Sequence, residues 1–224
     1  MKILAIDTTS RFLCIGAYDG KTIYEYNLDA QTRHSALLVI SIKRILDCLH
    51  WQVPDVDYFA CAVGPGSFTG MRVGLSTIKG LAWASNRGIV GVSSLDLIAQ
   101  NALPTKAKQV IPVIDAKRNL VYYSIYASKK ESLKRIIPYR LSTLDELIKK
   151  IKPGSVLLGD ALGLYKDKIQ KTRKGAFFLD KDYWYPRPDK LLDIALEKIR
   201  KKKVTNAFAV KPIYLYPKEC QVKK

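Results

Sequence analysis

The sequence has few of the residues and patterns on which several functional classes depend. Only two histidines are present, His34 and His50, and they form no HxxxH or HExxH metal-binding pair. Its four cysteines contain no CxxC pairing, which favours buried reduced thiols over a disulfide framework. No apolar run approaches the roughly 18–20 residues of a membrane span, and the apolar run 3–6 is too short for a signal peptide. These absences predict a cytoplasmic protein with no metal site, no cofactor and no membrane contact.

The charge is strongly positive and unevenly distributed. The net charge is +18, yet residues 1–100 carry 9 basic and 8 acidic residues, which leaves 29 of the 38 basic and 12 of the 20 acidic residues for 101–224. Such asymmetry is typical of a chain whose second half contacts a polyanion such as RNA. Lysine clusters such as 201–203 are also typical of a lysine-rich or heat-adapted surface, and few aromatic residues accompany them. Both interpretations stay open.

Two segments resemble each other, ILAIDTTSRFLCIGAYDGKTIYEYNL at 3–28 and IPVIDAKRNLVYYSIYASKKESLKRI at 111–136. Each has an apolar strand that ends in Ile-Asp, a short turn, an alternating strand and a third short strand. The two aspartates, Asp7 and Asp115, lie 108 residues apart, close to half the chain. The repeat predicts an α/β protein with a duplicated three-strand meander plus helices. We expect an N-terminal lobe at 1–104 and a smaller basic lobe at 105–224.

A glycine-rich loop follows a predicted strand at 57–63 and precedes a predicted helix at 70–86. This is the setting in which backbone N–H groups and a helix N-terminus bind phosphate. The loop nevertheless lacks the lysine of GxxxxGK[ST] and the third glycine of GxGxxG, where Thr69 stands. Spacing therefore favours a structural turn over a phosphate site. We call this loop and the turn after the first strand the degenerate anion loop, because they resemble a phosphate site that has lost its binding features. Its residues are Asp7, Thr8, Thr9, Gly64, Gly66, Ser67 and Thr69.

The turns after the two repeated strands also lack the features of an ATP site. Duplicated folds of this kind, such as actin, the sugar kinases and the Hsp70 ATPase, hold ATP phosphates with Asp-x-Gly turns, because glycine lets the backbone approach the phosphate. Here the turns read DTTS at 7–10 and DAKR at 115–118, without glycine. The adjacent His34 and Ser35 cannot form a catalytic triad with each other. We expect no catalytic residues.

Two predicted helices carry more apolar surface than one buried face requires. Helix 34–49 is apolar nearly all round, and helix 70–86 has small residues at spacings of 4, 3, 3 and 4 that permit close helix approach. This pattern predicts a protein–protein interface, although the sheet and the second lobe together could also cover both faces. The expected interface residues are Leu38, Ile42, Ile45, Gly70, Gly74, Thr77, Ile78 and Leu81.

Several motifs together resemble the TsaB (YeaZ) family: ILAIDTTS at 3–10, RHS at 33–35, VGPGSFTGMRVGLSTIKGLA at 63–82, GVSSLDLIA at 91–99 and IDAKR at 114–118. The GPGSFTG-x-R-x-G block is highly specific, and beyond residue 118 the resemblance is mainly architectural. The resemblance implies a two-lobed actin-like (ASKHA, ribonuclease-H-like) fold. Ala36 is a departure, since the family often has an acid after His-Ser.

The resemblance also implies a function. TsaB is the non-catalytic subunit of the bacterial complex that makes threonylcarbamoyladenosine in tRNA. The implied partners are a TsaD-type catalytic subunit that packs on the two helices and a TsaE-type ATPase. From the pattern of the two helices, we expect a second copy of this chain to replace TsaD in its absence. From the charge of the second half, we expect tRNA to make at most an auxiliary contact. The alternative is a stand-alone ATP-binding kinase-like or peptidase-like member of the same fold.

Overall fold

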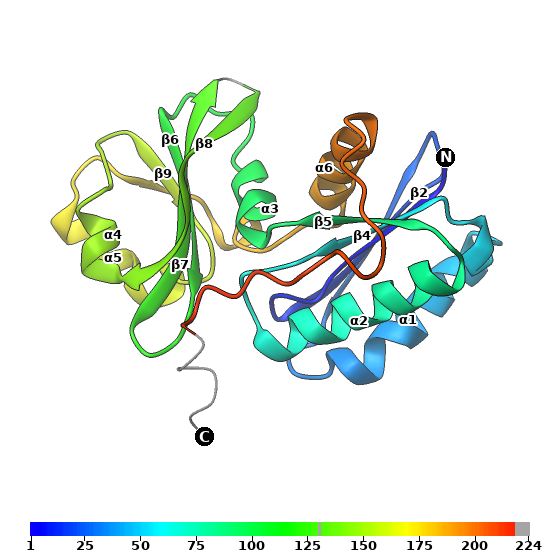
Figure 1. Ribbon diagram of the computed structural model, residues 1–224. Coiled ribbons are helices and arrows are strands. Elements are labelled where there is room, and N and C mark those ends of the chain that lie inside the picture. Colours follow the sequence, from blue (N-terminus) through cyan, green and yellow to red (C-terminus); the bar gives the residue numbers. More distant parts are fainter. Residues whose placement is uncertain (130, 218–224) are drawn as a thin grey trace. The chain divides into compact units, whose positions relative to one another are not determined.

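The computed structural model describes residues 1–129 and 131–217, which form two compact units (Figure 1). Unit 1 comprises Met1–Leu97 and Pro186–Ile213, and unit 2 comprises Ile98–Tyr185 and the chain from Tyr214. Among the described residues, no helix has both the length and the apolar character that crossing a membrane requires. Cys14 and Cys61 are buried as predicted, Cys48 is exposed, and Cys220 lies outside the described residues.

Unit 1 is built on a mixed five-stranded sheet with the order β3-β2-β1-β4-β5. β1 pairs antiparallel with β2 and parallel with β4, and β4 pairs parallel with β5. The central strand β1 is buried throughout, which explains its continuous apolar run. The strands are β1 (Ile3–Asp7), β2 (Phe12–Tyr18), β3 (Ile23–Asp29), β4 (Tyr58–Ala62) and β5 (Gly88–Val92).

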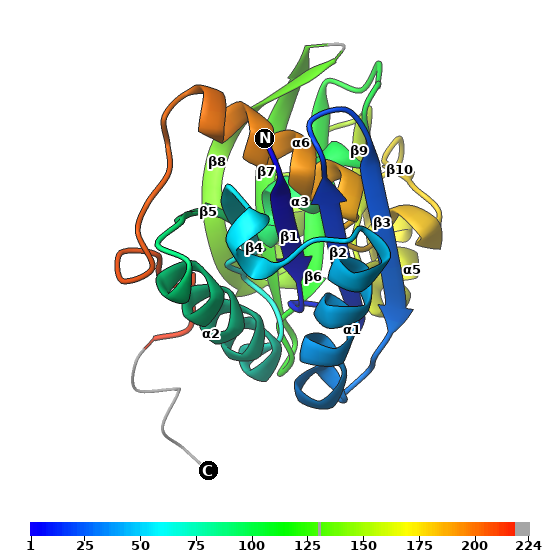
Figure 2. The same ribbon diagram turned by 90° about the vertical axis from the view of Figure 1, so that its right-hand side faces the viewer.

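Helices cover both faces of this sheet. α1 (His34–Cys48) and α2 (Phe68–Ala84) lie on one face, and α6 (Pro188–Arg200) lies on the other (Figures 1 and 2). Alternate side chains of β1 point to the two faces, so Leu4 and Ile6 join the core under α1 and α2. Ile3 and Ala5 join the core under α6, where they meet Leu191, Leu192 and Ala195. Shorter elements of the same region are η1 (Val53–Asp55) and α3 (Ser94–Gln100).

The division into units differs from the single break expected at 104/105. A break there would place α6 in the second lobe, whereas α6 belongs to unit 1 because its apolar face covers the first sheet. Gly16 leaves room for this packing, since a methyl group there would lie 2.9 Å from the Leu192 side chain. The segment after α6 also stays in unit 1, where Thr205 bridges to Ile89 at the edge of β5.

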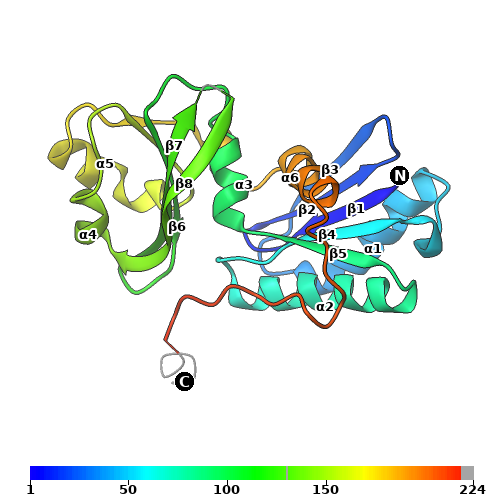
Figure 3. The same cartoon turned by 45° about the horizontal axis from the view of Figure 1, so that its top comes forward.

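Unit 2 repeats the topology of unit 1. Its sheet has the order β10-β9-β6-β7-β8, which read from β8 matches the order β3-β2-β1-β4-β5. α4 (Leu144–Ile148) and α5 (Leu162–Thr172) lie on the same side of this sheet (Figure 3). The duplicated meander is therefore confirmed. The remaining elements are β6 (Gln109–Asp115), β7 (Leu120–Lys129), β8 (Ser132–Thr143), β9 (Ser155–Leu158), β10 (Phe177–Phe178) and η2 (Lys181–Tyr183).

Candidate functional site

The glycines of the loop and of α2 form a seat for the turn that follows β1. A methyl group added at Gly66 would collide with the carbonyl oxygen of Thr9. A methyl group at Gly70 would collide with the carbonyl oxygen of Thr8, and one at Gly74 with the Thr8 hydroxyl. A side chain at any of these three glycines would push the 8–9 turn away, because the turn packs directly against the backbone of the loop and of α2.

Hydrogen bonds hold the turn in this seat. The Thr8 hydroxyl donates to the carbonyl of Gly70 at 2.7 Å, and the Ser67 N–H donates to the carbonyl of Thr9 at 2.8 Å. The Ser94 hydroxyl donates to the Thr9 hydroxyl at 2.8 Å. Thr8 and Thr9 are both buried. The hydroxyls and the Ser67 N–H, which a phosphate would otherwise attract, therefore have partners within unit 1.

The start of the loop is constrained as well. Gly64 has a φ of +92°, and a side chain there would also collide with the Met71 sulfur. Ser67 caps α2, because its hydroxyl accepts a hydrogen bond from the Gly70 N–H at 3.2 Å. The structure thus brings together six of the seven residues assigned to the degenerate anion loop, and Thr69 lies on the outside of α2.

Asp7 is a buried acid at the end of β1. Its Oδ1 accepts the Thr9 N–H at 2.5 Å, and its Oδ2 is buried without a hydrogen-bond partner among the described residues. Burial raises the pKa of Asp7 from its ordinary 3.8 to about 6, although the hydrogen bond from Thr9 opposes this shift. Cys14 stands opposite Asp7 on β2, and burial, together with the charge of Asp7, raises the pKa of that thiol as well.

The equivalent turn of unit 2 begins with Asp115, which lies beside a second acid, Asp160. The Asp115 N–H donates to Asp160 Oδ1 at 2.9 Å, and the Lys117 ammonium donates to Asp115 Oδ2 at 2.6 Å. Burial raises the pKa of Asp160 to about 6, and the neighbouring Asp115 charge adds to the rise. The residues 117–119 are all left-handed, with φ between 52° and 63°. In place of a phosphate-binding glycine turn, this unit therefore has an acid paired with its own lysine.

Sequence reasoning did not single out Asp160. The sequence feature that could have identified Asp160 is its position directly after the apolar strand 155–158 and Gly159. Gly159 has a φ of +117°, which allows the chain to turn at the end of that strand. For metal chemistry, the described residues contain no group of three or more His, Cys, Asp or Glu side chains placed to hold an ion. His34 is buried at the start of α1, with its Nε2 3.3 Å from the carbonyl oxygen of Phe12.

The residues expected at a partner interface divide into two groups. Ile45, Thr77 and Leu81 are half-buried, whereas Leu38, Ile42, Gly70, Gly74 and Ile78 are buried inside unit 1. This placement corrects the expectation for the buried five, because they face the sheet and the 8–9 turn and are not available to a partner. The spacing of the small residues located a strip on α2 but did not reveal which way the strip faces.

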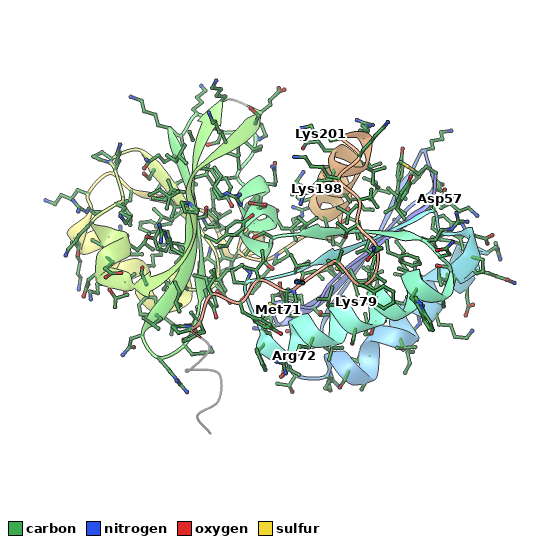
Figure 4. All side chains as sticks on the ribbon, viewed as in Figure 1. Asp57, Met71, Arg72, Lys79, Lys198 and Lys201 are labelled. Atoms are coloured by element: carbon green, nitrogen blue, oxygen red, sulfur yellow. The ribbon has the colours of Figure 1, made fainter. Side chains whose placement is uncertain are left out.

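The outer sides of α1 and α2 carry large apolar side chains of their own. Val39 and Ile40 on α1 are each 62% exposed, and Phe68 and Trp83 on α2 are 43% and 69% exposed. The Arg72 guanidinium lies 3.8 Å from the centre of the Phe68 ring. Figure 4 shows Arg72 on the outer side of α2 and its neighbour Met71 on the sheet side. An apolar outer surface on two adjacent helices is a candidate protein-binding face.

Together, the repeated β-meander and the acid at the end of each first strand define an actin-like α/β protein of two units. The fold matches the solved structure of YeaZ from Pseudomonas aeruginosa with a TM-score of 0.83 and 23% sequence identity, over 96% of this chain and 99% of that one.

Residues 28–183 match the family model described as TsaD: tRNA N6-adenosine threonylcarbamoyltransferase. The tRNA threonylcarbamoyladenosine biosynthesis protein TsaB of Bacillus subtilis is 29% identical over 100% of this chain and 97% of its own length. TsaB of Buchnera aphidicola subsp. Schizaphis graminum is 28% identical over 92% of this chain and 98% of its own. The chain belongs to the family that this model describes and, within it, to the TsaB (YeaZ) family.

A matched pair of glycine substitutions in α2 tests the seat. Gly70→Ala should lower the free energy of unfolding by about 1–3 kcal/mol, because the methyl group meets the Thr8 carbonyl. Gly80→Ala should raise it by about 0.5–1 kcal/mol, because nothing lies within 4 Å of its methyl position. Urea denaturation of both variants measures the difference. Equal effects of the two substitutions would contradict the packing of the Thr8–Thr9 turn against Gly70.

A pH series tests the buried carboxylate of Asp7. The folded pKa of about 6 exceeds the ordinary 3.8, so the folded state binds this proton more tightly than the unfolded state does. The cost of ionised Asp7 is therefore absent below pH 3.8 and complete above pH 6. Relative to wild type, Asp7→Asn should gain about 3 kcal/mol of unfolding free energy between acid pH and neutral pH. A difference that stays constant across the pH series would show that Asp7 is not buried as described.

Proposed function

We propose that this chain is a non-catalytic subunit that binds a TsaD-type catalytic subunit in the formation of threonylcarbamoyladenosine in tRNA. The names of its relatives in Bacillus and Buchnera, and of the matching family model, support the pathway. The partner-binding role depends on one observation, the exposed apolar side chains on the outer side of α1 and α2. A TsaE-type ATPase is the further partner that the family implies.

The chemistry of this outer face suits a protein partner. Trp83, the most exposed of its four large apolar side chains, belongs to the residue types that dominate binding energy at interfaces. Gly80 lies on the same side of α2, is exposed and has open space around it. A helix of the partner can therefore approach the α2 backbone closely at Gly80. The proposed contact is a helical bundle, of which α1 and α2 form half.

The non-catalytic role is supported by the turns that follow β1 and β6, whose polar groups already have partners within the protein. The hydroxyls of Thr8 and Thr9 are occupied by protein partners, and Lys117 is paired with Asp115. A kinase-like or peptidase-like activity would need a phosphate-binding turn or an activated nucleophile. No such group is present among the residues described at these turns, so the proposed activity belongs to the partner.

Substitutions on the outer face should abolish partner binding without unfolding the chain. Ile40→Asp places a charge in a contact that loses water on binding, and Gly80→Leu fills the space that the partner helix would occupy. Each should weaken the complex with the TsaD-type subunit at least about tenfold, a loss that corresponds to about 1.4 kcal/mol. Co-purification and titration calorimetry measure this loss.

The matched control is Leu164→Asp on α5, because Leu164 is 66% exposed but lies in unit 2. This variant should bind the partner like wild type. Circular dichroism should show all three variants folded. If Ile40→Asp and Gly80→Leu both bind normally, the interface lies elsewhere. If they disrupt only self-association, the face is a homodimer contact.

The isolated chain should show no transferase, kinase or peptidase turnover. A modification assay with each subunit omitted in turn should require this chain only together with the TsaD-type subunit. Robust ATP hydrolysis by the pure chain that is lost in Asp7→Ala would instead support the stand-alone kinase-like alternative.

A further inference from the structure

The β8 strand carries a row of cations along the edge of the second sheet. β8 is the outermost strand in the order β10-β9-β6-β7-β8, and its 12 residues, Ser132–Thr143, include three cations and no acid. The cations are Lys134, Arg135 and Arg140, and all three are exposed. Lys134 and Arg140 pair with Ala127 and Tyr123 of β7, which lie four residues apart. A strand rises about 3.3 Å per residue, so the cations extend over about 13 Å of the sheet.

Other cations of unit 2 lie near the end of the β7–β8 hairpin. Lys129 ends β7 and pairs in register with Ser132 at the start of β8. The Ser128 N–H donates to the carbonyl of Lys108 at 3.2 Å, which brings the segment before β6 beside the hairpin. Lys106 and Lys108 are both exposed there. We call these six residues the β8 basic edge: Lys106, Lys108, Lys129, Lys134, Arg135 and Arg140.

The β8 basic edge combines charge with an aromatic ring and an exposed aliphatic side chain. The Arg135 guanidinium lies 4.1 Å from the centre of the Tyr139 ring, and Ile136 between them is 48% exposed. Lys134 and Arg135 are consecutive, so they point to opposite faces of the ribbon. A cationic edge also discourages pairing with another strand, and Pro138 serves the same purpose. That role, however, does not require cations contributed by three separate segments.

The lysine cluster at 201–203 is a weaker candidate for a polyanion site than its sequence suggests. It follows α6 in unit 1, at a helix C-terminus where cations are stabilised by the helix dipole. Lys201 forms an ion pair with Glu197, and Lys198 donates to the carbonyl of Gly91 at 2.7 Å. Figure 4 shows Lys198 on α6 and Lys201 at the end of this helix. The ion pair of Lys201 and its position at the helix end give this part of the cluster a local structural role.

We propose that the β8 basic edge binds the phosphate backbone of RNA. The identification of that RNA as tRNA rests on the proposed function. Cations on both faces of a β-ribbon can contact phosphates of a single RNA strand or phosphates on the two sides of an RNA groove. An arginine stacked on a tyrosine also offers a surface on which an unpaired base can stack. Binding of this kind is independent of sequence and weakens as salt rises, because each phosphate contact releases a condensed counterion.

The test is fluorescence anisotropy of the full chain with an unmodified tRNA transcript over a series of salt concentrations. The variant K134Q/R135Q/R140Q removes the three cations of β8. The control K149Q/K150Q/K152Q removes the same charge from exposed positions after α4 in the same unit. The β8 variant should lose at least about tenfold in affinity, and its slope of log affinity against log salt should become shallower by about 2–3. The control should lose less than about threefold.

The proposal is wrong if the wild-type chain does not bind the tRNA at low salt, or if the two triple variants lose the same affinity for it. It is also wrong if a poly-glutamate peptide binds as tightly as the tRNA, because the edge would then suit an acidic protein. Lys134→Gln and Arg140→Gln alone should each reduce the slope by about one unit, which keeps the test decisive if the triple variant misfolds. All β8 variants should still bind the TsaD-type subunit. Unchanged RNA affinity with intact partner binding would refute this inference alone.

Discussion

The packing of the Thr8–Thr9 turn against the glycine face of α2 is the contact on which the rest of unit 1 depends. It joins the central strand β1 to the helix without side chains between them, because Gly66, Gly70 and Gly74 leave room only for backbone and one hydroxyl. This contact uses the groups that would otherwise bind a phosphate. It also fixes which side of α2 is internal, so the other side, with Gly80 and Trp83, remains exposed.

The buried carboxylates show a cost of this arrangement. Asp7 ends β1 and Asp160 follows β9, and burial raises the pKa of each to about 6. Asp7 keeps one oxygen without a hydrogen-bond partner among the described residues, which costs free energy in a closed core. In unit 2, Lys117 balances the acid Asp115 directly. The two units thus share an acid at the end of the first strand and have the same sheet topology. The acid of unit 1 accepts a backbone N–H, whereas the acid of unit 2 pairs with a lysine.

Local patterns in the sequence predicted most of the fold. The alternation in 3–28 and 111–136 and the shared Ile-Asp ends identified the duplicated meander, because strand periodicity is a short-range signal. The small-residue strip of α2 was also visible, but its direction depends on Thr8, which is 62 residues from Gly70 in sequence. The same limit applies to α6, because the sequence does not reveal which sheet this helix covers. Similarly, the cations of the β8 basic edge come from three segments that only strand pairing brings together.

Hydroxyl-radical footprinting of the chain, alone and in complex with the TsaD-type subunit, tests the central claim most directly. The claim is that one side of α2 is internal and the opposite side binds the partner. Trp83 and Phe68 should be oxidised in the free chain and protected in the complex, while Met71 on the inner side, 3% exposed, should stay unreactive in both. Phe177, 61% exposed in unit 2, should react equally in both states. Unchanged oxidation of Trp83 and Phe68 in a complex that protects Phe177 would contradict the account.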